Sequence, residues 1–194
     1  MTTIQNETYL SMLQELGTES LDSSTFEILA SVDHRFLRDL KINVQNSLKF
    51  ENLTAKESAL LAFACSLNEK NHRLVEIFKN KSIQEGATNE ELADMIAVVG
   101  LLRMNNVFYR FRHFVEKEYY NATPAGLKMT AMGKPTISKE FFELASLAIS
   151  AMNGCETCVK SHEASVLHQG CTEARVYDAI RLSAVIRGFD AIVG

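Results

Sequence analysis

The stretch FFELASLAISAMNGCETCVKSHEASVLHQG, residues 141–170, predicts two helices joined by a tight turn. Ser138 can cap the first helix, and the turn dipeptide Asn153-Gly154 ends it. The second helix starts near Cys155 and ends at Gly170, because glycine commonly terminates helices. The stretch therefore indicates a helical hairpin with two cysteines at the start of its second helix.

The rest of the chain has the same helical character. Apolar residues recur at spacings of three and four in 57–67 and 90–102, and no segment alternates as a strand would. Three segments carry the capping-box pattern of a helix start: Ser24 with Glu27, Thr54 with Glu57, and Thr88 with Glu91. We therefore predict an all-α fold whose aromatic and methionine side chains lie in the core.

Both prolines lie in NATPAGLKMTAMGKPTI, residues 121–137, together with two glycines. A helix cannot easily run through such a segment, so we interpret it as a connector. The chain then reads as one domain over residues 1–194. A first repeat covers about 55–120, and a second repeat covers about 138–194.

The two halves align with each other when the numbering is shifted by 84 residues. Residues 59–104 then lie on 143–188 without a gap, and a helix-ending glycine and a helix-starting threonine fall in register at Gly86/Gly170 and Thr88/Thr172. This pattern favours an internally duplicated helical unit. The alternative, that any two amphipathic hairpins align this well, stays open.

The alignment is informative where the halves differ. Each potentially reactive residue of the second half faces an inert one in the first: Glu143 aligns with Ala59, Cys155 with Asn71, Cys158 with Leu74, and His162 with Phe78. The first half is therefore expected to be scaffold, while the second half carries the chemistry.

The helix start at Cys155 favours a reactive dithiol. Only the thiolate attacks, and the partial positive charge of a helix N-terminus stabilises it. Cys158 and His162 are four residues apart and share a helix face, so the imidazole can take the thiol proton. Cys155 is three residues before Cys158, a spacing at which two thiols can close a disulfide.

Glu143 lies on the preceding helix among apolar neighbours. If the two helices pack as an antiparallel hairpin, its carboxylate can reach His162 and orient the ring. A carboxylate, an imidazole and a thiol would then form the general arrangement of an activated nucleophile.

Other interpretations of the CxxC pair are weaker. A structural zinc site needs four ligands, and neither a second CxxC nor another close histidine supplies them. A thioredoxin-like motif needs a βαβ context, which is missing. Cys65 is expected to fill the core, Cys171 to lie in a loop, and His168 to be structural.

Composition restricts the class of protein. The chain of 194 residues is 46% hydrophobic and 23% charged, which is ordinary for a soluble domain. The net charge of -4 and the lack of basic runs argue against nucleic-acid binding. No secretory signal pattern or uncharged membrane-length apolar run is visible, so we expect a cytoplasmic protein without membrane contact.

The spacing E-x11-C-x2-C-x3-H, together with MNNVFYRFRHF at 104–114, AGLKM and NGCETCVKSHE, resembles the alkyl hydroperoxidase D (AhpD) family of the carboxymuconolactone decarboxylase-like superfamily. The similarity covers roughly residues 55–190. The resemblance implies an all-helical fold with an internal repeat and a homo-oligomer, often a trimer. It also implies an antioxidant enzyme that reduces organic hydroperoxides.

The resemblance further implies a redox cycle without a bound cofactor or metal. Electrons would come from the lipoyl group of a dihydrolipoamide acyltransferase and pass to an AhpC-type peroxiredoxin. Cys158 would be the peroxide-attacking thiol and form a sulfenic acid. Cys155, the more exposed thiol, would resolve it as a Cys155–Cys158 disulfide, and Glu143 and His162 would relay protons.

Spacing supports the same order of thiols, because His162 is one helical turn from Cys158 and nearly two from Cys155. The helix dipole alone would favour Cys155, but it contributes only about 0.3–1 kcal/mol at exposed sites. The chain departs from some relatives at Thr157, where they carry histidine, which leaves the rate and the lipoyl partner open.

Two further questions stay open from the sequence. The polar residues of the 104–114 segment, Asn105, Asn106, Arg110 and Arg112, are interpreted first as lining a helix surface or a subunit interface, and second as shaping the thiol pocket. A general dithiol oxidoreductase and a non-enzymatic redox sensor are the alternatives to a peroxidase. A decarboxylase is weaker, because that branch is not built around a redox CxxC.

Overall fold

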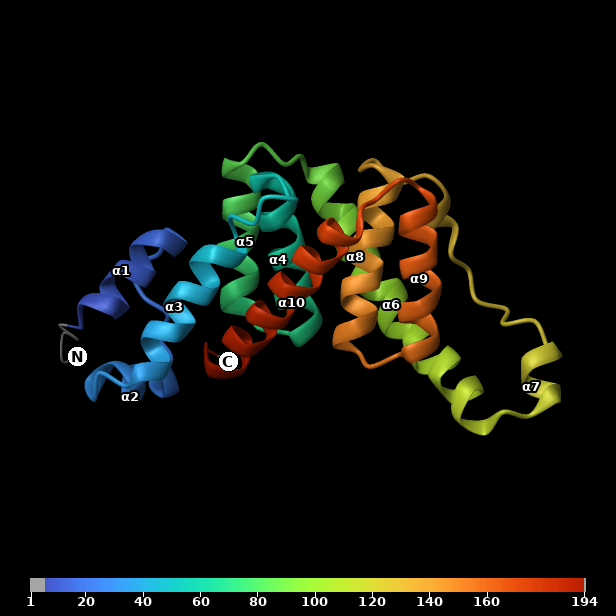
Figure 1. The fold of residues 1–194 in the computed structure, drawn as a ribbon, viewed down its shortest axis with the longest axis horizontal. Helices are drawn as coiled ribbons and strands as arrows, with labels where there is room; N and C mark the ends of the chain where they lie inside the picture. The colour runs from blue at the N-terminus through green and yellow to red at the C-terminus, as the bar shows by residue number, and fades with distance from the viewer. Residues whose placement is uncertain (1–5, 194) are drawn as a thin grey trace.

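The computed structural model describes residues 6–193 and confirms the all-α fold (Figure 1). The structure describes no strand in these residues. The helices are α1 (Glu7–Leu16), α2 (Ser24–Ser31), α3 (Arg35–Ser47), α4 (Ala55–Glu69), α5 (His72–Gln84), α6 (Asn89–Val115), α7 (Glu118–Ala122), the 3-10 helix η1 (Thr130–Gly133), α8 (Lys139–Met152), α9 (Glu156–His168) and α10 (Glu173–Val193). The expectation that the N-terminal segment carries no secretory signal pattern involves residues 1–5, which lie outside the described residues.

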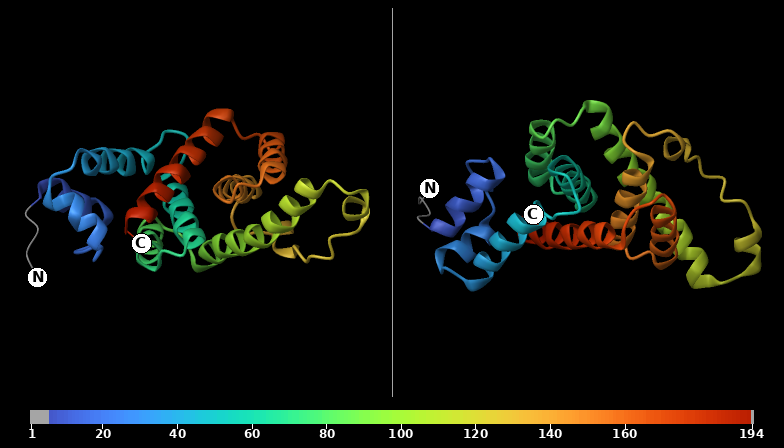
Figure 2. Two further views of the ribbon diagram at one scale, coloured as in Figure 1. Left: turned by 90° about the horizontal axis from the view of Figure 1, so that it is seen from below. Right: turned by 45° about the horizontal axis from the view of Figure 1, so that its top comes forward.

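Two helical hairpins form the centre of the molecule. The α4–α5 hairpin and the α8–α9 hairpin lie side by side, and α6 and α10 pack across them (Figure 1). Helices α1 to α3 gather at one end, where α3 packs on α10. At the other end α6 runs past the α8–α9 hairpin, and the connector returns from α7 as an extended segment (Figure 2).

The helix boundaries agree with the internal duplication. Helices α4, α5 and α6 start at residues 55, 72 and 89, and α8, α9 and α10 start at 139, 156 and 173. All three starts differ by the 84 residues that the sequence alignment requires. Helices α5 and α9 also have the same length, 13 residues.

Polar contacts repeat with the same offset. Arg103 donates to the backbone oxygen of Asn68, and Arg187 donates to that of Met152. Asn106 Nδ2 donates to Ser150 Oγ at 3.1 Å, whereas Asp190 and Ser66, at the positions related by 84 residues, are polar too but make no hydrogen bond to each other. The repeat therefore extends from helix lengths to the side chains that fasten the helices together.

Two of the three expected capping boxes are confirmed. Thr54 with Glu57 and Thr88 with Glu91 each close both hydrogen bonds of the box. The third prediction was wrong by one residue, because Ser23 is the N-cap of α2 and accepts from the Phe26 backbone. Ser23 also donates to the Ile192 backbone oxygen, a tertiary bond that fixes its place and that a local pattern cannot reveal.

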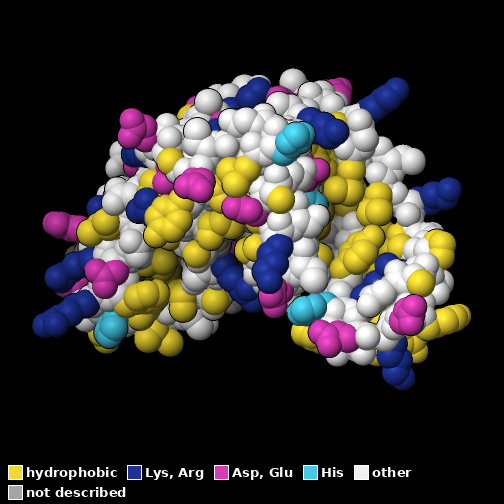
Figure 3. Space-filling view, turned by 45° about the vertical axis from the view of Figure 1, so that its right-hand side comes forward, with side chains coloured by type: hydrophobic (Ala, Val, Ile, Leu, Met, Phe, Trp, Pro, Cys, Tyr) yellow, Lys and Arg dark blue, Asp and Glu magenta, His cyan; other side chains and the backbone are white. Residues whose placement is uncertain are grey.

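The prediction that aromatic and methionine side chains lie in the core is wrong for the α6–α7 end and for two aromatic side chains elsewhere, Phe36 and Tyr177. Hydrophobic side chains gather on the face that carries the α6–α7 end (Figure 3). Exposed large apolar residues of this region are Met104, Val107, Phe111, Phe114 and Tyr119, with Phe114 73% exposed. Met104, Val107 and Phe111 share a face of α6 that α8 does not cover, because Asn106 and Arg110 are the residues that contact α8 along this stretch.

Helix α6 is the one helix in residues 6–193 that is long and apolar enough, by length and composition alone, to cross a membrane. It packs against α4 and α8, and its buried residues extend from Leu92 to Asn106. We interpret it as a core helix of the bundle.

Candidate active site

The α8–α9 hairpin brings together all four residues singled out from the sequence. Ser138 caps α8, Asn153 ends it, and Gly154 makes the turn with a φ of +68°. A positive φ is a conformation that glycine adopts without steric cost. Cys155 is the N-cap of α9, so Cys158 and His162 occupy its first two turns as expected.

The two cysteines are joined in a Cys155–Cys158 disulfide. Their exposure is the reverse of the expected order, because Cys155 is fully buried whereas Cys158 is 7% exposed. Cys155 lies directly after the turn and beneath the end of α8, while Cys158 borders a pocket. The expectation that Cys155 is the more accessible thiol is therefore wrong for this oxidised chain.

Glu143 reaches across the hairpin to the imidazole. Glu143 Oε2 lies 2.7 Å from His162 Nδ1, and the two side chains are 12% and 13% exposed. With the carboxylate ionised, Nδ1–H donates to it, which leaves Nε2 as the proton acceptor. This contact provides the carboxylate–imidazole pair that the sequence suggested.

The N-terminus of α9 differs from that of its counterpart α5. Asn71 caps α5, and its side chain accepts from the Leu74 backbone N–H. Cys155 stands at the equivalent position and makes no such bond in α9. The first backbone N–H groups of α9 therefore remain available to a thiolate.

A pocket of about 230 Å³ lies beside Cys158. The disulfide partner Cys155 does not line it. The lining comes from α6, the connector and α9: Leu102, Asn105, Tyr109, Met129, Met132, Thr157, Cys158, Ser161 and His162. The peroxide-attacking candidate and its base therefore share one small cavity with a largely apolar wall.

The 104–114 segment holds this site together, so its first interpretation as a surface or interface strip is wrong for Asn105 and Asn106. Both are buried. Asn106 Oδ1 accepts from Asn153 Nδ2 at 2.9 Å, and Arg110 Nη1 donates to the Asn153 backbone oxygen at 2.7 Å. These bonds fix the turn that precedes Cys155.

Sequence reasoning missed the methionines of the pocket. Met129 and Met132 belong to the connector, and η1 turns this part of the connector back toward α6 and α9. A Pro/Gly-rich segment gives no local signal of where its apolar side chains pack. Tyr109 also lines the pocket; it belongs to the 104–114 segment, but no role was predicted for it.

The other two cysteines are poor nucleophiles. Burial raises the pKa of the Cys65 thiol to about 12. Burial and the neighbouring Glu140 carboxylate raise the pKa of Cys171 to about 12. Cys65 lies in the core and Cys171 in the loop after Gly170, as predicted.

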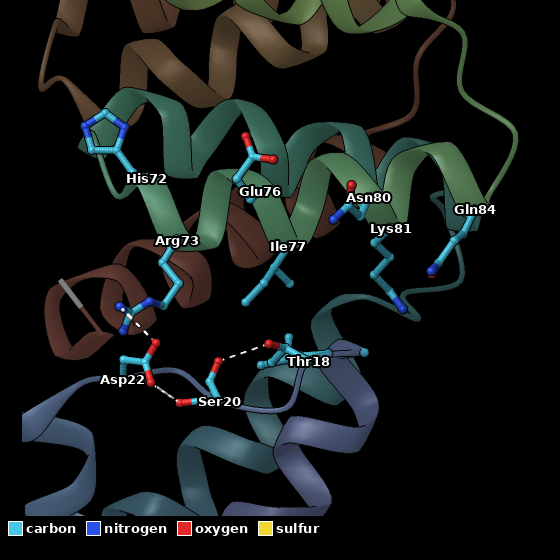
Figure 4. A pocket seen from close by; sticks show the side chains of 12 residues that line it. Thr18, Ser20, Asp22, His72, Arg73, Glu76, Ile77, Asn80, Lys81 and Gln84 are labelled. Atoms are coloured by element: carbon cyan, nitrogen blue, oxygen red, sulfur yellow. Dashed lines mark hydrogen bonds and ion pairs between the residues drawn. The ribbon is translucent and has the colours of Figure 1, made fainter.

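A second pocket of about 500 Å³ lies between the α1–α2 loop and α5, and no residue of the α8–α9 hairpin lines it (Figure 4). Arg73 pairs there with Asp22 at 3.5 Å, and Ser20 also contacts Asp22. The lining mixes cationic and acidic side chains and contains no cysteine. Across residues 6–193, no group of three or more His, Cys, Asp or Glu is arranged to hold a metal ion.

The duplicated helical fold and the hairpin that carries CxxC, His and Glu define an all-α dithiol protein. The family model of the carboxymuconolactone decarboxylase family matches residues 118–193, which include the whole α8–α9 hairpin. A crystal structure described as a gamma-carboxymuconolactone decarboxylase subunit from Burkholderia xenovorans LB400 has the same fold. Its TM-score is 0.70 over 94% of this chain and 92% of that chain, at 17% identity.

Closer relatives identify the branch. The protein named alkyl hydroperoxide reductase AhpD from Anaeromyxobacter dehalogenans strain 2CP-C is 42% identical over 77% of this chain and 80% of its own length. The protein of the same name from Solibacter usitatus strain Ellin6076 is 36% identical over 86% and 93%. The chain belongs to the AhpD family.

Proposed function

We propose that this chain is an alkyl hydroperoxide reductase that uses Cys158 as its attacking thiol. One observation carries the proposal: Cys158 lines a small pocket together with His162, whose other ring nitrogen is held by Glu143. The relatives named alkyl hydroperoxide reductase support the reaction class.

The cycle begins when the disulfide is reduced. His162 Nε2 takes the Cys158 proton, and Glu143 stabilises the imidazolium that forms. The thiolate attacks the terminal oxygen of the hydroperoxide, so an S–O bond forms and the O–O bond breaks. The sulfur is oxidised to a sulfenic acid, and the departing alkoxide takes the imidazolium proton and leaves as the alcohol.

Cys155 then closes the cycle. Its sulfur attacks the Cys158 sulfenic acid, the S–S bond forms, and hydroxide leaves with the thiol proton as water. A two-electron dithiol donor must restore the thiols by exchange. Burial of Cys155 means that an incoming thiol reaches the Cys158 sulfur first in this conformation.

We base the partners on the family resemblance described above. We propose the lipoyl group of a dihydrolipoamide acyltransferase as electron donor and an AhpC-type peroxiredoxin as electron acceptor, with no bound cofactor. This chemistry needs reduced thiols, which is consistent with a cytoplasmic enzyme.

We also propose that the chain assembles as a homo-oligomer, a trimer or a multiple of it. The exposed apolar residues Val107, Phe111 and Phe114 support this, because such patches mark protein interfaces. Sedimentation equilibrium tests the proposal. Phe111→Ser with Phe114→Ser should lower the mass to that of one chain, and a monomeric wild type would contradict it.

The reaction is tested by turnover of cumene hydroperoxide with dihydrolipoamide as donor. The wild type should consume peroxide and donor in a ratio of one to one. Cys158→Ser should abolish turnover, whereas Cys171→Ser, a matched control at a buried thiol outside the site, should retain it. Full turnover in Cys158→Ser would refute the mechanism.

The peroxide assay, together with the same assay on a model disulfide, distinguishes the peroxidase from the two alternative functions. An enzyme that reduces a model disulfide but leaves peroxide untouched would be a general dithiol oxidoreductase. A disulfide that forms with peroxide but is not reduced by any dithiol would indicate a redox sensor.

A further inference from the structure

Asn105 contains a buried, unpartnered polar atom and belongs to the wall of the pocket that Cys158 also lines. Its side chain lines the pocket that Cys158 and His162 share, and the residue is 5% exposed. Its Nδ2 donates to Met129 Sδ at 2.9 Å, but its Oδ1 has no hydrogen-bond partner among the described residues. A buried acceptor without a donor costs about 1–3 kcal/mol, so its retention in a pocket calls for an explanation.

The neighbouring asparagine shows what a structural role looks like. Asn106 uses both ends of its amide, donating to Ser150 Oγ and accepting from Asn153 Nδ2. The Asn105 side chain makes no hydrogen bond to another helix among the described residues. Its amide N–H donates instead to a sulfur atom, which is a weak acceptor. That bond has one clear geometric effect, because it fixes which way the amide lies in the pocket.

The orientation is set by chemistry. Turning the amide over would place Oδ1 against the Met129 sulfur, where neither atom can donate. The unpartnered atom is therefore an acceptor, and the molecule that completes it must carry an O–H, N–H or S–H group.

We propose that Asn105 is a substrate-binding residue whose Oδ1 accepts the O–H of the hydroperoxide. This inference rests on the proposed function and deepens it. The O–H lies on the terminal oxygen, which is the oxygen that sulfur attacks. Oδ1 is closed to solvent in the disulfide form, so the proposal requires that release of Cys158 from Cys155 opens room for the peroxide between the sulfur and Asn105.

The bond leaves the reaction balanced. The terminal O–H is transferred whole to sulfur, so Asn105 gains and loses no proton and only holds that group in place. The proton that the alkoxide needs comes from His162, as in the cycle above. Asn105 therefore lowers the barrier by orientation and is not an acid or base.

The rest of the pocket indicates the class of substrate. Leu102, Met129 and Met132 present apolar surface, and the connector supplies both methionines. An apolar cavity of about 150 Å³ encloses benzene, so one of about 230 Å³ accommodates a ring with a short branch. The proposed substrates are compact alkyl and aryl hydroperoxides, of which cumene hydroperoxide is the test compound.

The test measures single-turnover oxidation of reduced enzyme by cumene hydroperoxide in Asn105→Ala. We expect the second-order rate constant to fall about tenfold, the effect of losing one hydrogen bond of ordinary strength. Alkylation of Cys158 by iodoacetamide in the Cys155→Ser background should stay unchanged, because it needs the thiolate but no peroxide site. Ser58→Ala, which removes another unpartnered buried oxygen outside the pocket, should alter neither rate.

The outcomes are distinct. An unchanged peroxide rate in Asn105→Ala overturns the inference, and so does an equal fall in peroxide and iodoacetamide rates, which would make Asn105 part of the pocket's structure. Met129→Leu, which keeps the side-chain volume but removes the sulfur acceptor, should lower the peroxide rate less than Asn105→Ala. A wild type that reduces no hydroperoxide refutes the proposed function itself, independently of the Asn105 comparison.

Discussion

The buried carboxyl group of Asp190 should make the free energy of unfolding depend on pH by an amount that can be calculated. It lies on α10 and is 5% exposed, and neither carboxyl oxygen has a hydrogen-bond partner among the described residues. Burial raises the pKa of Asp190 to about 7; the neighbouring Ser66 hydroxyl opposes this shift, and the nearby Glu69 carboxylate adds to it. The duplicated position in the first half holds Asn106, the neutral isostere.

Asp190→Asn should therefore stabilise the protein at high pH. Because the folded-state pKa lies above the ordinary value of 3.8, the folded protein binds more protons than the unfolded chain between about pH 4 and 7. The wild type then loses stability relative to the variant by about 1.4 kcal/mol per pH unit in that window. Above about pH 7 the difference is constant.

Urea unfolding at pH 5 and pH 8 measures this difference. The advantage of Asp190→Asn over the wild type should be about 3 kcal/mol larger at pH 8, from about two pH units within the window. All other titrating groups are common to both proteins and cancel. Asp39→Asn, at an exposed carboxylate, serves as the control and should show no such change.

An equal stability difference at the two pH values would contradict this prediction, because it would mean that Asp190 titrates alike in the folded and unfolded protein. If the wild type gained stability relative to Asp190→Asn between pH 5 and pH 8, the prediction would have the wrong sign. That result would require a charged Asp190 with a partner, and the described residues supply none.

Three further predictions concern the site and its scaffold. Glu143→Gln keeps the side-chain shape but removes the negative charge that faces His162, so it should slow peroxide reduction at pH 7 about a hundredfold. An unchanged rate would exclude the relay. Arg175→Met should lower the free energy of unfolding by about 3 kcal/mol, because Glu57 and Glu140 lose their shared cation; Glu57→Gln in that background should recover part of the loss in urea unfolding. Ellman's reagent at pH 8 should titrate two thiols in the reduced native protein and four after unfolding, because the pKa values of Cys65 and Cys171 are about 12; a fast third thiol would contradict this.

The α8–α9 hairpin shows what sequence could predict. The Ser138 cap, the Asn153-Gly154 turn and the helix start at Cys155 are local signals, and each appears where expected. The reach of Glu143 to His162 followed from hairpin geometry, which the turn dipeptide already implied. These features depend on residues close in the chain.

The errors concern features that depend on tertiary packing. Exposure of Cys155 is set by how α9 meets α8, and the pocket wall by how η1 folds back over α6. Asn105 and Asn106 look alike in sequence, yet one completes the turn and the other keeps an open acceptor. Only the packing of α6 on the hairpin distinguishes them.

In the proposed mechanism the terminal oxygen of the peroxide is transferred to the Cys158 sulfur. Reduced Cys155→Ser should be treated with one equivalent of cumene hydroperoxide in the presence of dimedone, and the labelled peptide identified by mass spectrometry. We expect a dimedone adduct at Cys158, absent when Cys158 is also replaced by serine. In the reciprocal variant Cys158→Ser, a sulfenic acid that forms on Cys155 as fast would contradict it.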